Sequence, residues 1–143
     1  MGSMLDRKAY RATRQSASQG LFLLSDSSLL PKDICHVNIG LALAEQLNGM
    51  APAERQDMLA SSFSSILSGN GQDIVLEHID ILFDPQWEID TLQFLLKAGR
   101  NKRLYIVWPG RLDITGLSYA EPDDADYHQY DYKNYIDTYA VMK

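Results

Sequence analysis

Short apolar runs alternate along the chain with segments whose apolar residues recur at helical spacing. Four of the runs have the length and composition of buried strands, and they occupy residues 21–24, 34–39, 73–77 and 104–108. The helical spacing predicts four helices, over residues 5–19, 40–47, 52–67 and 84–98. Because helices separate most of the strands, the pattern predicts an α/β layer fold with a mostly parallel sheet.

Two features of this pattern bear on the core and on the helix ends. Asp84 and Pro85 form the clearest helix start, since an aspartate can cap a helix and proline suits the first helical position. Trp108 ends the fourth strand, just before a Pro-Gly turn, and we expect it to pack as a core residue.

The link between the first two predicted strands is too short for the usual crossover. Only residues 25–33 separate these strands, whereas parallel strands need a connection of about a dozen residues or more, usually with a helix. Two alternatives follow. Either these strands pair in another way, or the first crossover helix is missing.

Length and composition fit one compact domain. The chain has 143 residues, of which 45% are hydrophobic, enough for a substantial single core. Residues 1–4 resemble a cloning remnant, so we assign the domain to residues 5–143, with a tyrosine- and aspartate-rich extension over residues 117–143.

Cys35 is the only cysteine in the sequence. An intrachain disulfide is therefore excluded, which favours a reducing, cytoplasmic location. No stretch approaches the roughly 18 apolar residues of a membrane span, and no signal pattern begins the chain. Cys35 alternates within a predicted strand, so we expect a buried thiol. His36, His78 and His128 have no metal-binding spacing with it, and we expect no metal site.

Charge disfavours a general affinity for nucleic acid or anionic membranes, because the net charge is −6. Basic residues nevertheless cluster in the first predicted helix, at Arg7, Lys8, Arg11 and Arg14. Four cations provide a limited phosphate footprint. One hypothesis is thus a nucleic-acid-binding module with weak, salt-sensitive affinity.

A carboxylate ends the third predicted strand, at Glu77, and Asp80 follows it closely. P-loop enzymes hold magnesium beside a nucleotide with such a carboxylate, because ligands gather at the carboxyl ends of parallel strands. The alternative is an ordinary solvated strand end.

Three segments in the same order carry a family resemblance: DIVLEHIDILFDP, LLKAGRNKRLYIVWPG and LSYAEPDDADYHQY. Together they resemble BrxF, the small P-loop protein of type 3 bacteriophage-exclusion (BREX) defence systems, over residues 21 to about 130. Glu77, His78 and Asp80 stand where that family has Asp, Asn and Glu. Direct matches to the family pattern are Leu82 to Pro85, Arg100-Asn101, Trp108 to Gly110 and Tyr119 to Pro122. The resemblance implies a three-layer fold like that of P-loop NTPases and partners among defence-system proteins.

The chain departs from that family at the phosphate loop. No Gly-x-x-x-x-Gly-Lys-Ser/Thr segment occurs anywhere in it, although this loop surrounds and neutralises the phosphates. The interpretation is a reduced fold without its first crossover helix, acting as a non-catalytic binding or scaffold subunit with no cofactor. The alternative is an ATPase whose phosphate loop comes from a partner chain, with Glu77, Asp80 and Arg100 completing a site for ATP and Mg²⁺.

Two further groups have a functional and a structural interpretation. Arg100 and Asn101 could sense a nucleotide, or could simply place basic charge at a helix C-terminus. The acidic, tyrosine-rich tail could bind a partner or wrap over its own sheet, and the residues concerned are Tyr119, Glu121, Tyr127 and Tyr130. The sequence leaves open whether the chain forms a homo-oligomer.

Overall fold

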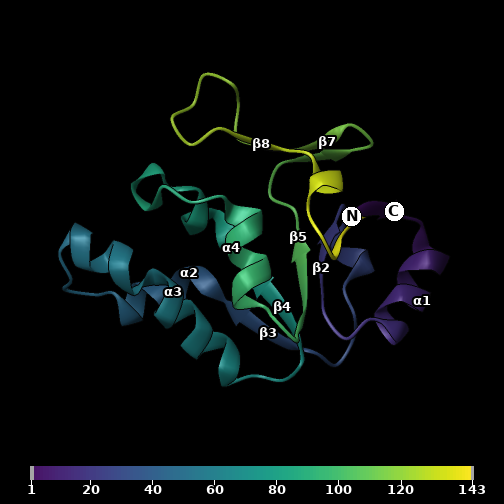
Figure 1. Cartoon of the computed structure of the whole chain (residues 1–143), viewed down its shortest axis with the longest axis horizontal. Helices are drawn as coiled ribbons and strands as arrows, with labels where there is room; N and C mark the ends of the chain where they lie inside the picture. Colours follow the sequence, from purple (N-terminus) through teal and green to yellow (C-terminus); the bar gives the residue numbers. More distant parts are fainter. Residues whose placement is uncertain (1, 143) are drawn as a thin grey trace.

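The computed structural model describes residues 2–142, and within them the main feature is a six-stranded sheet whose neighbouring strands all run parallel (Figure 1). The strand order is β1–β9–β2–β5–β4–β3. The bounds are β1 (Ser3–Leu5), β2 (Gly20–Leu24), β3 (Cys35–Asn38), β4 (Asp73–Glu77), β5 (Arg103–Val107) and β9 (Thr138–Val141). The prediction of an α/β fold with a parallel sheet is confirmed.

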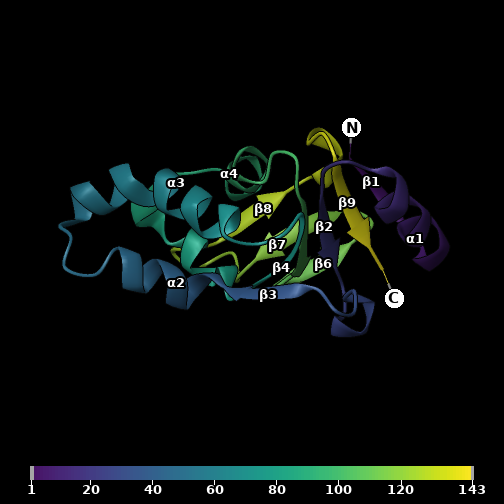
Figure 2. The same ribbon diagram turned by 90° about the horizontal axis from the view of Figure 1, so that it is seen from below.

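Helices cover both faces of this sheet, which gives three layers. They are α1 (Arg7–Ser16), α2 (Ile39–Gln46), α3 (Pro52–Ser68) and α4 (Thr91–Ala98). In β2, Leu21 and Leu23 belong to the large core under α2, α3 and α4, whereas Phe22 and Leu24 join a smaller core with Tyr10 of α1. This division follows from the alternation of side chains along a strand. Accordingly, α1 lies at the opposite end of the molecule from α2 and α3 (Figure 2).

The link from β2 to β3 (residues 25–34, the β2–β3 link) contains no α-helix. Its one regular element is a short 3-10 helix, η1 (Ser27–Leu29). β2 and β3 do not pair, because β5 and β4 lie between them. Ten residues reach roughly 33 Å when extended, which is enough to cross three strand spacings of about 4.8 Å each. Leu29 is buried in the smaller core, so the link fills space on this face with apolar side chains.

The helix predicted from Asp84 begins later, at Thr91. Asp84 caps only a 3-10 turn, η3 (Pro85–Trp87), which ends where Glu88 adopts a left-handed conformation with φ of 51°. Trp87 turns inward and its Nε1 donates a hydrogen bond to the Ile81 carbonyl at 2.7 Å. The α4 helix then starts at a second capping residue, Asp90.

The C-terminal segment is ordered, not an irregular extension. It forms an antiparallel sheet of β6 (Arg111–Asp113), β7 (Gly116–Tyr119) and β8 (His128–Tyr130), beyond the carboxyl ends of the main strands (Figure 1). A further 3-10 helix, η4 (Tyr132–Asn134), leads into β9 inside the main sheet. Trp108 is buried as expected, and its Nε1 donates to the Ser118 carbonyl at 2.9 Å.

The two edge strands of the sheet, β1 and β3, differ from what the sequence predicts. Ser3 and Met4, which lie in the presumed remnant, form part of β1 and pair with β9. Cys35 lies in β3 at the other edge and is exposed, so the expectation of a buried thiol is wrong. Its Sγ donates to Asn70 Oδ1 at 2.9 Å. An edge strand is covered less completely than an inner one, which accounts for the exposure. In residues 2–142, no helix has the length and apolar character needed to cross a membrane.

Candidate functional site

A pocket of about 290 Å³ lies at the carboxyl ends of β4 and β5, and we call it the carboxyl-edge pocket. Its lining includes Ser27 and Leu30 of the β2–β3 link, Glu77 and Asp80 after β4, and Val107 and Pro109 after β5. The pocket lies next to β2, the strand at which the strand order reverses, since later strands lie on both sides of β2. Ligands of open α/β sheets bind outside the carboxyl ends of strands at such reversals. The carboxyl-edge pocket is therefore the first candidate for a functional site.

Glu77 reaches this pocket because it is the last residue of β4. Its side chain is 47% exposed, and Oε2 lies 3.3 Å from Nδ1 of His36 on the adjacent strand β3. The pair becomes an ion pair when the imidazole is protonated. Because both side chains are largely solvated, the attraction between them is weak, and Glu77 stays accessible to a ligand or partner.

Asp80 lies on the other side of the pocket, in the 3-10 helix η2 (Ile79–Phe83). His78 precedes it in a left-handed conformation with φ of 58°, which turns the chain sharply after β4. Tyr119 Oη donates to Asp80 Oδ2 at 3.4 Å. Burial, with the negative charge of Asp80, raises the pKa of Tyr119, so the phenol remains a donor at neutral pH. The structure thus brings Glu77 and Asp80 to one pocket, as the sequence predicts.

The two carboxylates alone do not make a preformed metal centre. Among residues 2–142, no group of three or more histidine, cysteine, aspartate or glutamate side chains is arranged to hold a metal ion. Oxygen ligands from elsewhere would have to complete the coordination of Mg²⁺, which prefers octahedral geometry. As it stands, the pocket offers an acidic rim over apolar side chains, among them Val107, which is 36% exposed.

Arg100 and Asn101 lie at the opposite edge of the sheet from this pocket. They precede β5, whose first residue Arg103 is in register with Asp73 at the start of β4. Glu77 stands four residues further along β4, or roughly 13 Å along the strand. The Asn101 N–H donates instead to Gln19 Oε1 at 3.0 Å. The structure therefore does not bring Arg100 and Asn101 together with Glu77, and a role of these two residues in sensing a nucleotide stays a prediction.

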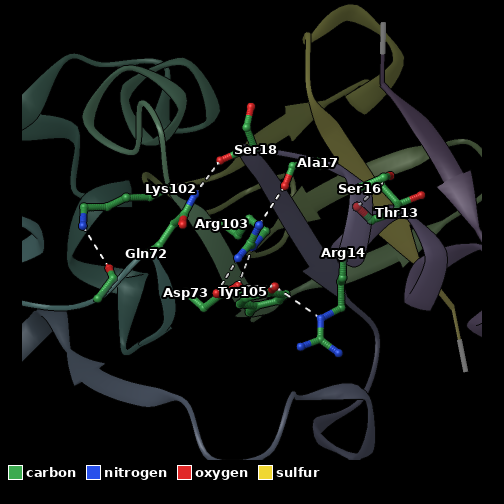
Figure 3. Close-up of polar contacts among 11 residues, drawn as sticks. Thr13, Arg14, Ser16, Ala17, Ser18, Gln72, Asp73, Lys102, Arg103 and Tyr105 are labelled. Carbon is green, nitrogen blue, oxygen red and sulfur yellow. Dashed lines mark hydrogen bonds and ion pairs between the residues drawn. The ribbon is translucent and has the colours of Figure 1, made fainter.

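A polar network at this amino edge was not anticipated from the sequence (Figure 3). Arg103 donates to Asp73 through Nε at 2.6 Å and through a terminal nitrogen at 2.7 Å, and to the Ala17 carbonyl at 2.8 Å. Tyr105 Oη donates to Asp73 Oδ1 at 2.8 Å, and Arg14 Nε donates to Tyr105 Oη at 3.3 Å. Hydrogen bonds from Arg103 lower the pKa of Asp73. The network ties the end of α1 to the sheet. In the sequence, the only sign of it is that an acidic residue, Asp73, begins one strand and a basic residue, Arg103, begins another.

The four basic residues of the predicted first helix all lie on α1, but in different environments. Arg7, Lys8 and Arg11 are exposed, whereas Arg14 is half-buried. Its guanidinium lies over the rings of Tyr10 and Tyr105, at 5.6 and 5.3 Å from their centroids. Arg14 therefore supports the fold as well as contributing charge.

The residues expected to form a partner surface in the tail divide into two groups. Tyr130 is buried, and its Oη accepts a hydrogen bond from the Thr91 N–H at 3.3 Å, so it is withdrawn from the surface. The Tyr119 ring stacks on Phe83 with centroids 4.0 Å apart. Glu121 and Tyr127, by contrast, line an open hollow of about 280 Å³ beside Pro109. The tail therefore packs on its own domain and buries Tyr130, while Glu121 is exposed and Tyr119 and Tyr127 are half-buried.

Comparison with known proteins yields no relative for this chain: no protein-family model, curated protein or solved structure matches it.

Proposed function

We propose that this chain is a non-catalytic, P-loop-like subunit that binds other proteins of a bacterial anti-phage assembly of the BREX type in the cytoplasm. The observation that carries the proposal is the β2–β3 link. It follows the strand that would lead into a phosphate loop, yet it has neither glycine nor a suitably placed lysine, and it buries Leu29 on the sheet.

The strand order supports the P-loop-like part of the proposal by fold-level analogy. One class of P-loop ATPases inserts a strand between the strand that leads to the phosphate loop and the strand that ends in the magnesium-binding carboxylate. Here β5 lies between β2 and β4, and Glu77 ends β4. The motif resemblance and the sheet order thus agree on the same assignment of strands.

The loss of nucleotide binding follows from the contacts that the link does not offer. A phosphate loop supplies several charge-assisted hydrogen bonds, each worth about 1.5–3 kcal/mol. In this chain no lysine or arginine is among the residues that line the carboxyl-edge pocket, so none is placed there to neutralise a triphosphate. Its acidic rim and apolar floor instead suit a protein partner with basic and apolar side chains.

Calorimetry on the isolated protein tests the non-catalytic part. Titration with ATP and Mg²⁺ should give no binding heat. Micromolar binding that is abolished in Glu77→Ala, but kept in Glu54→Ala as a matched control at an exposed position of α3, would contradict the proposal. Co-expression with the products of neighbouring genes tests the subunit part, because a stable complex should co-elute in size-exclusion chromatography. Elution of every protein alone would count against an assembly.

The open position of Glu77 and Asp80 favours one alternative, an ATPase whose phosphate loop comes from a partner chain. ATP turnover would then appear only on mixing with the partner, and it would fall in Glu77→Gln. Arg100→Ala should leave the turnover unchanged, since Arg100 lies at the other edge of the sheet. Turnover that is absent from every mixture would exclude this alternative.

A further inference from the structure

A further hollow lies on the face of the sheet that α1 covers, between α1 and η1, and we call it the α1–η1 hollow. It has a volume of about 160 Å³, and its lining consists of Arg7, Tyr10, Arg11, Arg14, Ser28 and Leu29. Three of the six residues are arginines. The hollow is separate from the carboxyl-edge pocket, and nothing in the proposed function uses it.

The arginines converge because of their spacing. Arg7, Arg11 and Arg14 recur at intervals of four and three residues, which places them on one face of the helix. Lys8 follows Arg7 directly, points to an adjoining face, and does not line the hollow. The structure therefore divides the basic cluster into three arginines that share a site and one lysine outside it.

The positive charge of the hollow is only partly compensated. No acidic residue occurs between Arg7 and Gln19, and in residues 2–142 the ion pairs found, His36–Glu77 and Asp73–Arg103, include none of the three arginines. Asp73 nevertheless lies close enough that the charge of Arg14, after the hydrogen bonds from Arg103, helps to lower the pKa of Asp73. Like charges three or four residues apart destabilise a helix, so a bound anion would stabilise α1.

Arg14 is held in a fixed orientation at the base of this hollow. Its guanidinium packs over two tyrosine rings and its Nε donates to Tyr105 Oη. Figure 3 shows the two terminal nitrogens pointing away from Tyr105. Because the side chain is already ordered, little further rotamer entropy is lost when these nitrogens bind an acceptor.

The opposite wall is also fixed. Tyr10 Oη donates to the Leu29 carbonyl at 2.9 Å, a buried hydrogen bond that joins α1 to η1. Burial raises the pKa of Tyr10, which keeps its phenol protonated as the donor. This contact holds Ser28, with its hydroxyl group, beside the arginines. The hollow therefore has a preformed shape with donors on both walls.

We propose that the α1–η1 hollow binds one phosphate group. Guanidinium groups match phosphate oxygens with paired, charge-assisted hydrogen bonds, and arginine is the residue best suited to this contact. A volume of about 160 Å³ is smaller than the roughly 300 Å³ at the low end of pockets for whole small molecules. The site accordingly takes a single phosphate, either free or as part of a nucleic-acid backbone.

An NMR titration of the full chain tests this proposal. Sodium phosphate is added to ¹⁵N-labelled protein, with sodium chloride at equal ionic strength as the control. Resonances of Ser28, Leu29 and the arginine Nε groups should shift and saturate with phosphate only. Arg11→Gln should weaken the affinity about tenfold, as expected for loss of a charge-assisted contact, whereas Lys8→Gln, with the same change in charge, should weaken it less than about twofold.

The possible outcomes distinguish specific binding of phosphate in the α1–η1 hollow from a non-specific attraction of phosphate to the basic residues of α1. Equal losses in the two glutamine variants, or no saturable shift with phosphate, would overturn the proposal. Arg14→Lys keeps the charge but removes the planar fork, so it should also reduce affinity if the hollow is the site. A short single-stranded oligonucleotide that shifts the same resonances would identify the source as a nucleic-acid backbone. Saturation by inorganic phosphate alone would identify free phosphate. Nucleotide binding at the carboxyl-edge pocket, which Ser27 and Leu30 line, would leave the arginine Nε resonances in place.

Discussion

Arg103 and Asp73 open two adjacent parallel strands and join them through two hydrogen bonds of 2.6 and 2.7 Å. The side chains are 19% and 27% exposed, respectively. Because Arg103 also donates to the Ala17 carbonyl just after α1, the pair connects three elements. It stabilises the amino edge of the sheet, away from the carboxyl-edge pocket, and Tyr105 connects Asp73 by hydrogen bonds to Arg14 of the α1–η1 hollow.

Asp73→Asn should destabilise the protein without changing the fold. The amide leaves Arg103 without its charged partner, and we expect the free energy of unfolding to fall by about 1–2 kcal/mol, given the partial exposure. Urea denaturation followed by tryptophan fluorescence measures this change. Asp57→Asn, at an exposed position in α3, is the matched control and should change the stability by less than about 0.5 kcal/mol.

The stability that Asp73 provides should depend on pH in one direction. Hydrogen bonds from Arg103 lower the pKa of Asp73 from its ordinary value of 3.8, so the folded state favours the carboxylate. The contribution is complete above about pH 4 and is lost as the pH falls through the lowered value. The difference in unfolding free energy between wild type and Asp73→Asn should therefore be constant from pH 7 to pH 5 and shrink below pH 4. A difference that grows in acid would contradict this linkage.

Tyr10→Phe should loosen the contact between α1 and η1. The variant loses one buried hydrogen bond to the Leu29 carbonyl and leaves that acceptor without its donor, which costs about 1–3 kcal/mol. Thermal unfolding gives the cost, and faster amide exchange at Leu29 and Leu30 would locate it. Tyr127→Phe removes a hydroxyl that donates to Gln129 Oε1 in an exposed hydrogen bond, and it should be close to neutral. If both variants lost a comparable amount of stability, the hydrogen bond of Tyr10 would contribute no more than an exposed one.

Cys35 should react with a thiol reagent in the folded protein. Its side chain is exposed at the edge strand β3, so 5,5′-dithiobis(2-nitrobenzoic acid) should modify one thiol per chain without denaturant. Far-UV circular dichroism should be unchanged after modification. Protection of the thiol until the protein unfolds would mean that β3 is covered, as the sequence pattern alone had suggested.

The strands were predictable where turn residues or charged residues in the sequence mark where each strand begins and ends. β4 coincides with its predicted range because a turn precedes it and the apolar run ends at Glu77. The start of α4 was misplaced because Asp84 and Asp90 are both capping residues, and the inward turn of Trp87 depends on tertiary packing. β1 and β9 were missed, since their pairing joins segments from the two ends of the chain and leaves no local pattern.

The candidate functional residues, too, were predictable only where a local pattern in the sequence marks them. Glu77 and Asp80 were found because a carboxylate at a strand end is a local signal. The alternative of a shared site grouped Arg100 with them, but the structure places Arg100 at the other edge, and a linear sequence does not say which edge of the sheet a residue occupies. Asp73 and Arg103 were overlooked because their pairing depends on β4 and β5 being neighbours, which the sheet order decides.

The pairing of β1 with β9 offers a route to rearranging the chain. Ser3 lies beside Tyr139 and Leu5 beside Val141, so the first and last strands are neighbours and a short glycine linker could join them (Figure 1). New ends could be opened at Gly49, where an added Cβ atom would meet open space. In such a circular permutant the new termini would lie between α2 and α3, far from the basic helix α1. A tag or a fused protein attached there would leave the arginine face of α1 accessible.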